Sequence, residues 1–246
     1  EAPRPPPPPV SSPRESERAR LRVVAEVEAA SPACADCGAS RPEWCVINVG
    51  ALVCLRCSGV HRSLGTHVSK VRSLRLDRLP AATLRLVRAI GNARANAIFE
   101  THVPEGAKPR PRSDAKTLQR FARDKWEARI YTPRDAAAGD RLLEAAASGD
   151  VMEALAALAA AEDPSAIVNA RPGTDGGGPL HAAARNGHLL VAQLLLLNGD
   201  AGDLVRAADA RGRSPRDLLK RRALDLDADA DAVEQTNMLD FLLSPK

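Results

Sequence analysis

The pattern of apolar and polar positions changes twice along the 246 residues. Residues 1–18 are polar and rich in proline, which favours extended polyproline conformations, so we expect a disordered linker there. Short apolar runs between residues 34 and 77 predict strands joined by tight turns. After Pro80, apolar positions recur at helical spacing and predict a helix with one apolar stripe: Leu84, Val87, Ile90, Ala97 and Ile98.

Four further elements follow from the same pattern. Residues 46–48 and 52–53 flank Val49-Gly50 and predict a hairpin, and residues 71–76 predict another strand. We expect a short charged helix over about 15–29. A second helix with an apolar stripe is predicted to start near Ser113, with three buried positions: Leu118, Phe121 and Trp126.

The second half of the chain repeats itself. Residues 142–155 align with residues 179–195, and Gly149 then matches Gly187 at a spacing of 38. A period in the mid-thirties with helix–turn–helix content is typical of solenoid proteins. Residues 179–183, Pro-Leu-His-Ala-Ala, resemble the ankyrin signature, although Gly178 replaces its usual Thr. We expect an all-α array of about three ankyrin repeats over 138–243, with units at 138–171, 174–207 and 210–243, in which His181 bonds the loop of the adjoining unit.

The distribution of charge also separates the first half of the chain from the second. Residues 31–134 hold 19 Lys and Arg against 8 Asp and Glu, whereas residues 135–246 hold 11 against 18. The basic half is expected to attract anionic lipid, nucleic acid or an acidic protein. No run of eighteen apolar residues occurs, so no membrane-spanning helix is expected. Because the chain begins with Glu1, we expect it to be a fragment of a longer protein.

All five cysteines lie in one short segment. The spacing C-x2-C-x16-C-x2-C predicts a zinc site of four thiolates, each C-x-x-C pair forming a tight knuckle; its ligands are Cys34, Cys37, Cys54 and Cys57. Four protein ligands leave no open coordination position, so one zinc ion per chain would have a structural role. Cys45 falls outside the spacing and is expected to be a small buried residue, and His61 and His67 are expected to pack or form hydrogen bonds rather than bind zinc.

Residues 58–64 run directly from the second knuckle toward Gly65, a natural helix end. Helical geometry places Val60 and Leu64 on one buried face and Arg62 about 180° away, toward solvent or a partner. Geometry alone does not distinguish Arg62 from an ordinary exposed arginine.

The segment 34–77 resembles the zinc-finger domain of the Arf GTPase-activating proteins, and the likeness extends to about Tyr131. The family shares the cysteine spacing followed by a G-x-H-R-x-[LM]-G run, here residues 59–65. Its AGAP, ACAP, ASAP and ARAP types also carry ankyrin repeats after the finger. The resemblance implies an α+β zinc-finger domain over 19–134, with a small β-sheet and flanking helices, followed by the all-α ankyrin array.

The resemblance also implies a function and its residues. Arg62 would be the arginine finger that stimulates GTP hydrolysis by a GTP-bound Arf-family GTPase in trans, so the chain would not be an enzyme on its own. The partner contacts would be Trp44, Leu55, Leu76 and Asp77. The family further implies a cytoplasmic protein, peripheral at membranes, that acts in membrane traffic or actin regulation. Lys70, Arg72, Arg75 and 108–112 are either an ordinary solvated face or, since Arf proteins work on membranes, a basic rim that meets anionic lipid. The repeats would bind an unidentified protein.

Two other functions fit the residues. A GATA-like nucleic-acid-binding finger shares the cysteine spacing, and the pI near 9.0 suits it. Ser-Gly-Val-His-Arg after Cys57 is not a basic recognition segment, however, and aromatic residues are scarce, so no nucleic acid is expected. The other alternative is a scaffold whose finger is intact but idle.

Overall fold

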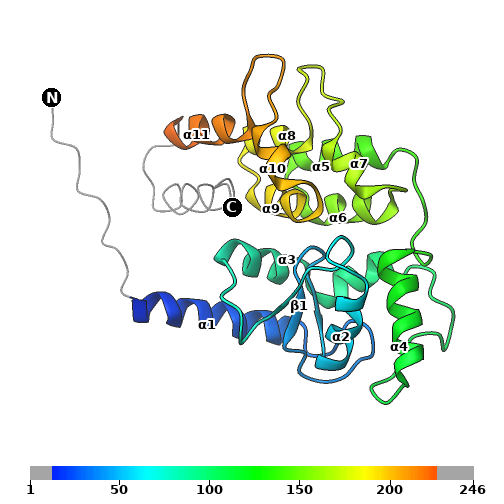
Figure 1. The fold of residues 1–246 in the computed structure, drawn as a ribbon. Coiled ribbons are helices and arrows are strands. Elements are labelled where there is room, and N and C mark those ends of the chain that lie inside the picture. Colours follow the sequence, from blue (N-terminus) through cyan, green and yellow to red (C-terminus); the bar gives the residue numbers. More distant parts are fainter. Residues whose placement is uncertain (1–12, 226–246) are drawn as a thin grey trace.

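The computed structural model describes residues 13–225, and the first twelve residues of the predicted linker lie outside this range. Helix α1, Pro13–Ala30, begins within that predicted linker and extends the predicted helix at both ends. Proline at the start of a helix is tolerated because the first N–H groups have no partner within the helix. Residues 13–18 are therefore helical rather than a linker, and α1 packs against α3, Ala81–Phe99 (Figure 1).

The predicted hairpin forms two strands of a small antiparallel sheet, although its first strand lies at 44–46 rather than at 46–48. The strands of the sheet are β1, Trp44–Val46, β2, Ala51–Val53, and β3, Val71–Ser73, in the order β2-β1-β3. The third strand is shorter than predicted. The side chains of Ser73 and Asp77 accept hydrogen bonds from backbone N–H groups, and these bonds fold the end of the strand into a turn. Ser73 Oγ accepts from the backbone N–H groups of Arg75 and Leu76, at 3.2 and 3.0 Å.

Helices α2, Leu55–Ser63, and α3 pack against this sheet, and α4, Ala115–Ala122, packs against α2 and continues into a π-helical turn, Arg123–Glu127. The predicted stripe on α3 is correct only for its first half. Gly91 breaks the helix with φ 67 and ψ 168, and this change of direction buries Ala95 and Phe99 instead of Ala97. The buried positions predicted near α4 are confirmed: Leu118, Phe121 and Trp126.

The second half is entirely helical within the described residues. Its helices are α5, Ala138–Ser148, α6, Val151–Ala160, α7, Pro164–Asn169, α8, Pro179–Asn186, α9, Leu189–Asn198, α10, Ala201–Arg206, and α11, Pro215–Asp225. Gly149 and Gly187, matched in the sequence repeat, both end the first helix of a pair in the left-handed conformation, with φ 85 and 75. The internal repeat is thus a repeat of helix pairs. Of the unit at 210–243, residues 226–243 lie outside the described range.

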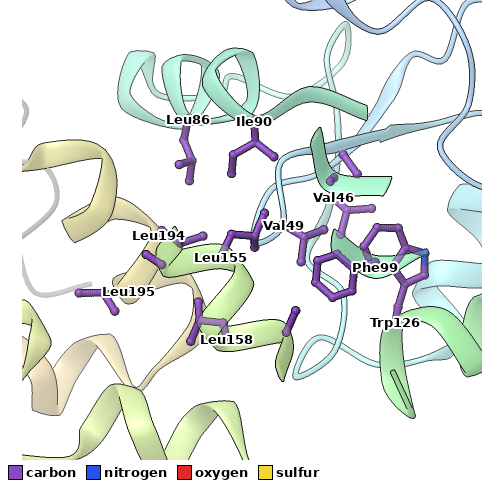
Figure 2. Packing of buried hydrophobic residues seen from close by; sticks show 14 of the residues in the cluster. Val46, Val49, Leu86, Ile90, Phe99, Trp126, Leu155, Leu158, Leu194 and Leu195 are labelled. Atoms are coloured by element: carbon purple, nitrogen blue, oxygen red, sulfur yellow. The ribbon is translucent and has the colours of Figure 1, made fainter. Parts of the chain in front are cut away.

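The two halves share one hydrophobic core. Helix α3 lies at the junction and packs against α6 and α9 (Figure 1). Figure 2 shows its Leu86 and Ile90 directed toward Leu155 of α6 and Leu194 of α9, all of them buried. Within residues 13–225, no helix combines the length and apolar composition that a membrane crossing requires.

Candidate functional site

Two backbone turns bring the four predicted zinc ligands together. In the first, the Cys34 N–H donates to the Ala39 carbonyl at 2.8 Å and the Gly38 N–H to the Cys34 carbonyl at 3.0 Å. Gly38 has φ +73, which favours glycine. In the second, Cys54 precedes α2 and Cys57 lies in its first turn, so the zinc site fixes the start of this helix.

The donor set fits zinc. All four sulfur atoms lie within 4.8 Å of one another, and those of Cys37 and Cys54 are 3.7 Å apart. Zinc–sulfur bonds of about 2.3 Å in a tetrahedron would separate the sulfurs by about 3.8 Å. The four cysteines form a zinc-binding site with a closed ligand set. Cys45 is buried outside it as predicted, and burial raises the pKa of its thiol to about 12.

Arg62 extends from the exposed side of α2 and lies over the indole ring of Trp44, with 4.5 Å between the guanidinium carbon and the ring centroid. Among residues 13–225, its guanidinium has no hydrogen bond or ion pair. The predicted outward direction is correct, but the predicted buried face is only partly so. Leu64 is buried, whereas Val60 is half-buried and His61 takes the buried position.

The other predicted contact residues differ in their surroundings. Leu55 and Leu76 are 69% and 81% exposed, which is unusual for large apolar side chains. Leu55 and Arg62 are seven residues apart on α2 and therefore share a face. Trp44 is half-buried. Asp77 is occupied within its own turn, since its carboxylate accepts the Ser73 backbone N–H at 2.6 Å.

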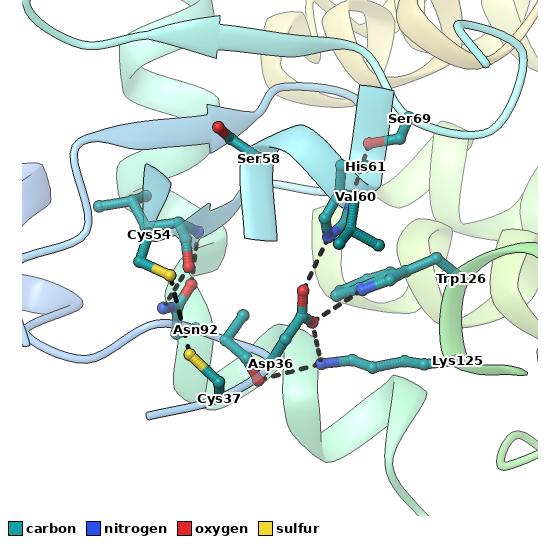
Figure 3. A network of polar contacts seen from close by, with 12 residues as sticks. Asp36, Cys37, Cys54, Ser58, Val60, His61, Ser69, Asn92, Lys125 and Trp126 are labelled. Carbon is teal, nitrogen blue, oxygen red and sulfur yellow. Dashed lines mark hydrogen bonds and ion pairs between the residues drawn. The ribbon is translucent and has the colours of Figure 1, made fainter. Parts of the chain in front are cut away.

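A buried polar network behind α2 was not predicted from the sequence (Figure 3). His61 Nε2 lies 2.9 Å from a carboxylate oxygen of Asp36, and Nδ1 lies 2.7 Å from Ser69 Oγ. The other Asp36 oxygen accepts from Trp126 Nε1 at 2.9 Å and from Lys125 Nζ at 3.4 Å. The expectation that His61 forms hydrogen bonds is confirmed.

Lys125 is the largest fully buried side chain of the described residues. Its ammonium group donates to Asn96 Oδ1 and Glu100 Oε1, each at 2.7 Å, and to the Ala35 carbonyl at 3.2 Å. Burial by itself would raise the pKa of the Asp36 carboxyl, but the charges of His61 and Lys125 hold this pKa well below its usual range. The network thus joins the first zinc knuckle, α2, α3 and the π-helical turn.

Several cations predicted for a lipid-facing rim have other partners. Lys70 is half-buried, and its Nζ donates to the Leu197 carbonyl at 2.6 Å. Desolvation by burial lowers the pKa of this lysine. Lys108 pairs with Glu100 at 2.6 Å, and Arg75 with Glu28 at 2.8 Å. Lys70 therefore does not belong to the rim, because its side chain bonds across the junction between the two halves. Arg72, Arg110 and Arg112 are exposed.

In the helical half, His181 bonds a backbone carbonyl as predicted, but its partner Ala207 is the last residue of its own predicted unit, 174–207, and not part of the adjoining one. Its Nε2 is 3.0 Å from the Ala207 carbonyl, in the segment that leads to α11. Its Nδ1 accepts the Gly178 N–H at 3.2 Å, at the start of α8. The histidine thus connects one helix pair to the segment that follows it.

Comparisons with known proteins agree on the first half of the chain. Residues 18–135 match the ArfGap family, described as "Putative GTPase activating protein for Arf". Stromal membrane-associated protein 1 of Homo sapiens is 39% identical over 105 residues, which cover 43% of this chain and 22% of that protein. ADP-ribosylation factor GTPase-activating protein AGD12 of Arabidopsis thaliana is 47% identical over 96 residues, 38% of this chain and 28% of that protein.

A third relative carries further domains in its name. Arf-GAP with coiled-coil, ANK repeat and PH domain-containing protein 2 of Gallus gallus is 40% identical over 114 residues, 46% of this chain and 15% of that protein. The matched segments thus span less than a third of the length of each of these three relatives. The segment 18–135, with its closed four-cysteine zinc site, three-stranded sheet and flanking helices, matches the ArfGap family.

Proposed function

We propose that this chain stimulates GTP hydrolysis by a GTP-bound Arf-family GTPase, with Arg62 inserted in trans. The family match and the printed names of the relatives support the activity. The observation that carries the assignment of Arg62 is its environment. It is an exposed arginine on a helix that zinc fixes, it lies over an indole ring, and it has no anionic partner among residues 13–225.

The proposed mechanism is electrostatic. As the bond to the γ-phosphoryl group breaks, negative charge spreads over phosphate oxygens of the GTP bound to the partner. The Arg62 guanidinium is planar, always charged and able to donate two parallel hydrogen bonds to such oxygens. An arginine supplied in trans accelerates hydrolysis by roughly 10³–10⁵. The closed zinc site leaves no position for substrate, so its part is to hold α2 in place.

The test is single-turnover GTP hydrolysis by a panel of lipid-bound Arf-family proteins, with wild type and Arg62→Lys in parallel. We expect stimulation by wild type and near-complete loss in the variant, because lysine keeps the charge but not the two-pronged geometry. Retention of more than about a tenth of the stimulation would contradict the role of Arg62. Flat traces from both proteins, each with one zinc per chain, would favour an idle scaffold or a nucleic-acid binder instead.

The GTPase is proposed to contact the face around Arg62. Leu55 and Leu76 expose enough apolar surface to be buried by a partner. Trp44 contributes its ring edge while its face supports Arg62. Asp77 is proposed to contribute by shaping the turn that presents Leu76, since its carboxylate is bonded within that turn.

The helical half is proposed to be an array of about three ankyrin repeats that binds an unidentified protein. The sequence period and the matching left-handed glycines support it. The name of the chicken relative includes an ANK repeat, although the matched segment covers 46% of this chain.

We further propose that the chain acts in the cytoplasm at membranes, in traffic or actin regulation, with exposed arginines of the zinc-finger domain facing anionic lipid. Arg72, Arg110 and Arg112 carry this proposal, because they are exposed and no carboxylate among residues 13–225 pairs with them. Each cation near an anionic surface contributes about 1 kcal/mol. The human relative is called membrane-associated in its name.

A further inference from the structure

The C-terminal end of α9 is hydrogen-bonded to two loops of the zinc-finger domain. Lys70 Nζ donates to the backbone oxygen of Leu197 at 2.6 Å. Asn198 Nδ2 donates to the backbone oxygen of Asn48 at 2.8 Å, and Asn48 Nδ2 lies 3.4 Å from Asn198 Oδ1. The last residue of α9 therefore holds the turn between β1 and β2.

The side chain of Asn48 in turn fixes the loop that leads from α2 to β3. Its Oδ1 accepts the Lys70 backbone N–H at 2.9 Å, and its Nδ2 donates to the Val68 carbonyl at 3.0 Å. A cavity of about 390 Å³, lined in part by Asn48, Val68 and Asn198, adjoins this junction. On this side, these polar contacts hold the loop in position together with Val68, which packs against the hydrophobic core.

Ser69 lies between the two residues that Asn48 holds, and it reaches α2. Its hydroxyl oxygen is 2.7 Å from Nδ1 of His61, whose side chain is fully buried. The other ring nitrogen is bound to Asp36, so both sides of the imidazole are fixed. His61 precedes Arg62 in the last turn of α2, and the direction of Arg62 depends on how this turn is held.

We propose that the helical half is a positioning element for Arg62, acting through Asn198, Asn48 and Ser69 on His61. The inference rests on the proposed function and adds a route by which the second half regulates the first. Movement of α9 would release the loop at 68–70, then His61, and so change where the guanidinium points. When a distant mutation misplaces a catalytic group by about 1 Å, the rate can fall about a hundredfold.

The main test variant is Asn198→Ala, and its matched control is Gln193→Met. Gln193 lies on the same helix and also bonds across the junction, from Nε2 to Thr83 Oγ1 at 3.3 Å, but Thr83 is on α3 and outside the path. Ser69→Ala is a second variant, which breaks the path at its other end. All three are compared with wild type as zinc-loaded full chains of equal melting temperature and zinc content.

The first readout needs no GTPase. We expect amide hydrogen exchange of residues 55–64, measured by mass spectrometry, to be faster in Asn198→Ala and Ser69→Ala and unchanged in Gln193→Met. The second readout is single-turnover hydrolysis. We expect the maximal rate to fall about ten- to hundredfold in the first two variants, with the half-saturating concentration unchanged. On an Arg62→Ala background, Asn198→Ala should cause no further loss.

The outcomes separate this inference from the proposed function. Exchange in α2 that stays at the wild-type level in both path variants would overturn the inference, as would equal losses from Gln193→Met or an additive loss on the Arg62→Ala background. If exchange in α2 rises as expected but wild type stimulates no Arf-family GTPase, the coupling between the halves stands and the proposed function falls.

Discussion

At the scale of single residues, two lysines bind the same carboxylate in different surroundings. Lys125 Nζ is 2.7 Å from one Glu100 oxygen and fully buried, whereas Lys108 Nζ is 2.6 Å from the other and 37% exposed. Removing one partner of a buried ion pair leaves the other charge unpaired, while exposed pairs contribute little. The buried lysine is therefore expected to matter far more for stability.

We predict that Lys125→Met lowers the free energy of unfolding by about 3–5 kcal/mol, because Asp36 then loses one of the charges that compensate its burial. Lys108→Met should lower it by less than about 1 kcal/mol. Urea unfolding of the zinc-loaded proteins, followed by circular dichroism, measures both. Equal losses from the two substitutions would show that the network around Asp36 does not depend on the Lys125 charge.

At the scale of elements, two glycines inside helices have opposite roles. Gly91 interrupts α3 with φ +67, and a β-carbon there would lie 3.3 Å from Ser31 Oγ. The Asn92 N–H donates to the same hydroxyl at 3.0 Å, so the break is tied to α1 and its exit. Gly59 lies within α2, and a β-carbon there would meet nothing within 4 Å.

We predict that Gly91→Ala lowers the free energy of unfolding by about 1–3 kcal/mol, because alanine is strained at positive φ. Gly59→Ala should raise it by about 0.5–1 kcal/mol, because alanine favours the helix. Thermal and urea unfolding check both signs. A stabilising Gly91→Ala would mean that α3 can continue without its break.

At the scale of the whole molecule, the zinc-binding domain and the helical half share one hydrophobic core. The cluster that contains Cys34 and Cys57 also contains Leu155 of α6 and Leu194 of α9. Loss of the zinc domain would expose these leucines to water, and this exposure costs about 25 cal/mol of free energy for each Å² of apolar surface. Structural zinc sites contribute folding energy directly.

We predict that a zinc chelator lowers the melting temperature of the whole chain and accelerates hydrogen exchange in α6 and α9 as well as in α2. Readdition of zinc should restore all three segments. Exchange in α6 and α9 that is unaffected by the chelator would show that the helical half folds independently of the metal.

The sequence by itself determined the features that depend on neighbouring residues. The zinc ligands follow from the C-x-x-C turns, and the hairpin and the helix pairs from apolar spacing and glycine positions. The outward direction of Arg62 also follows from helical period. The family resemblance, carried by the cysteine spacing and residues 59–65, agrees with the ArfGap match of residues 18–135.

Tertiary structure alone decided which distant groups meet. Asp36 and Lys125 are 89 residues apart, and Asn48 and Asn198 are 150 apart, so no local spacing links them. Charged and amide side chains are normally exposed, and nothing in their immediate sequence marks these four for burial or partial burial. Burial of His61 in place of Val60 has the same origin, because the partners that compensate an imidazole in the interior come from packed segments elsewhere in the chain.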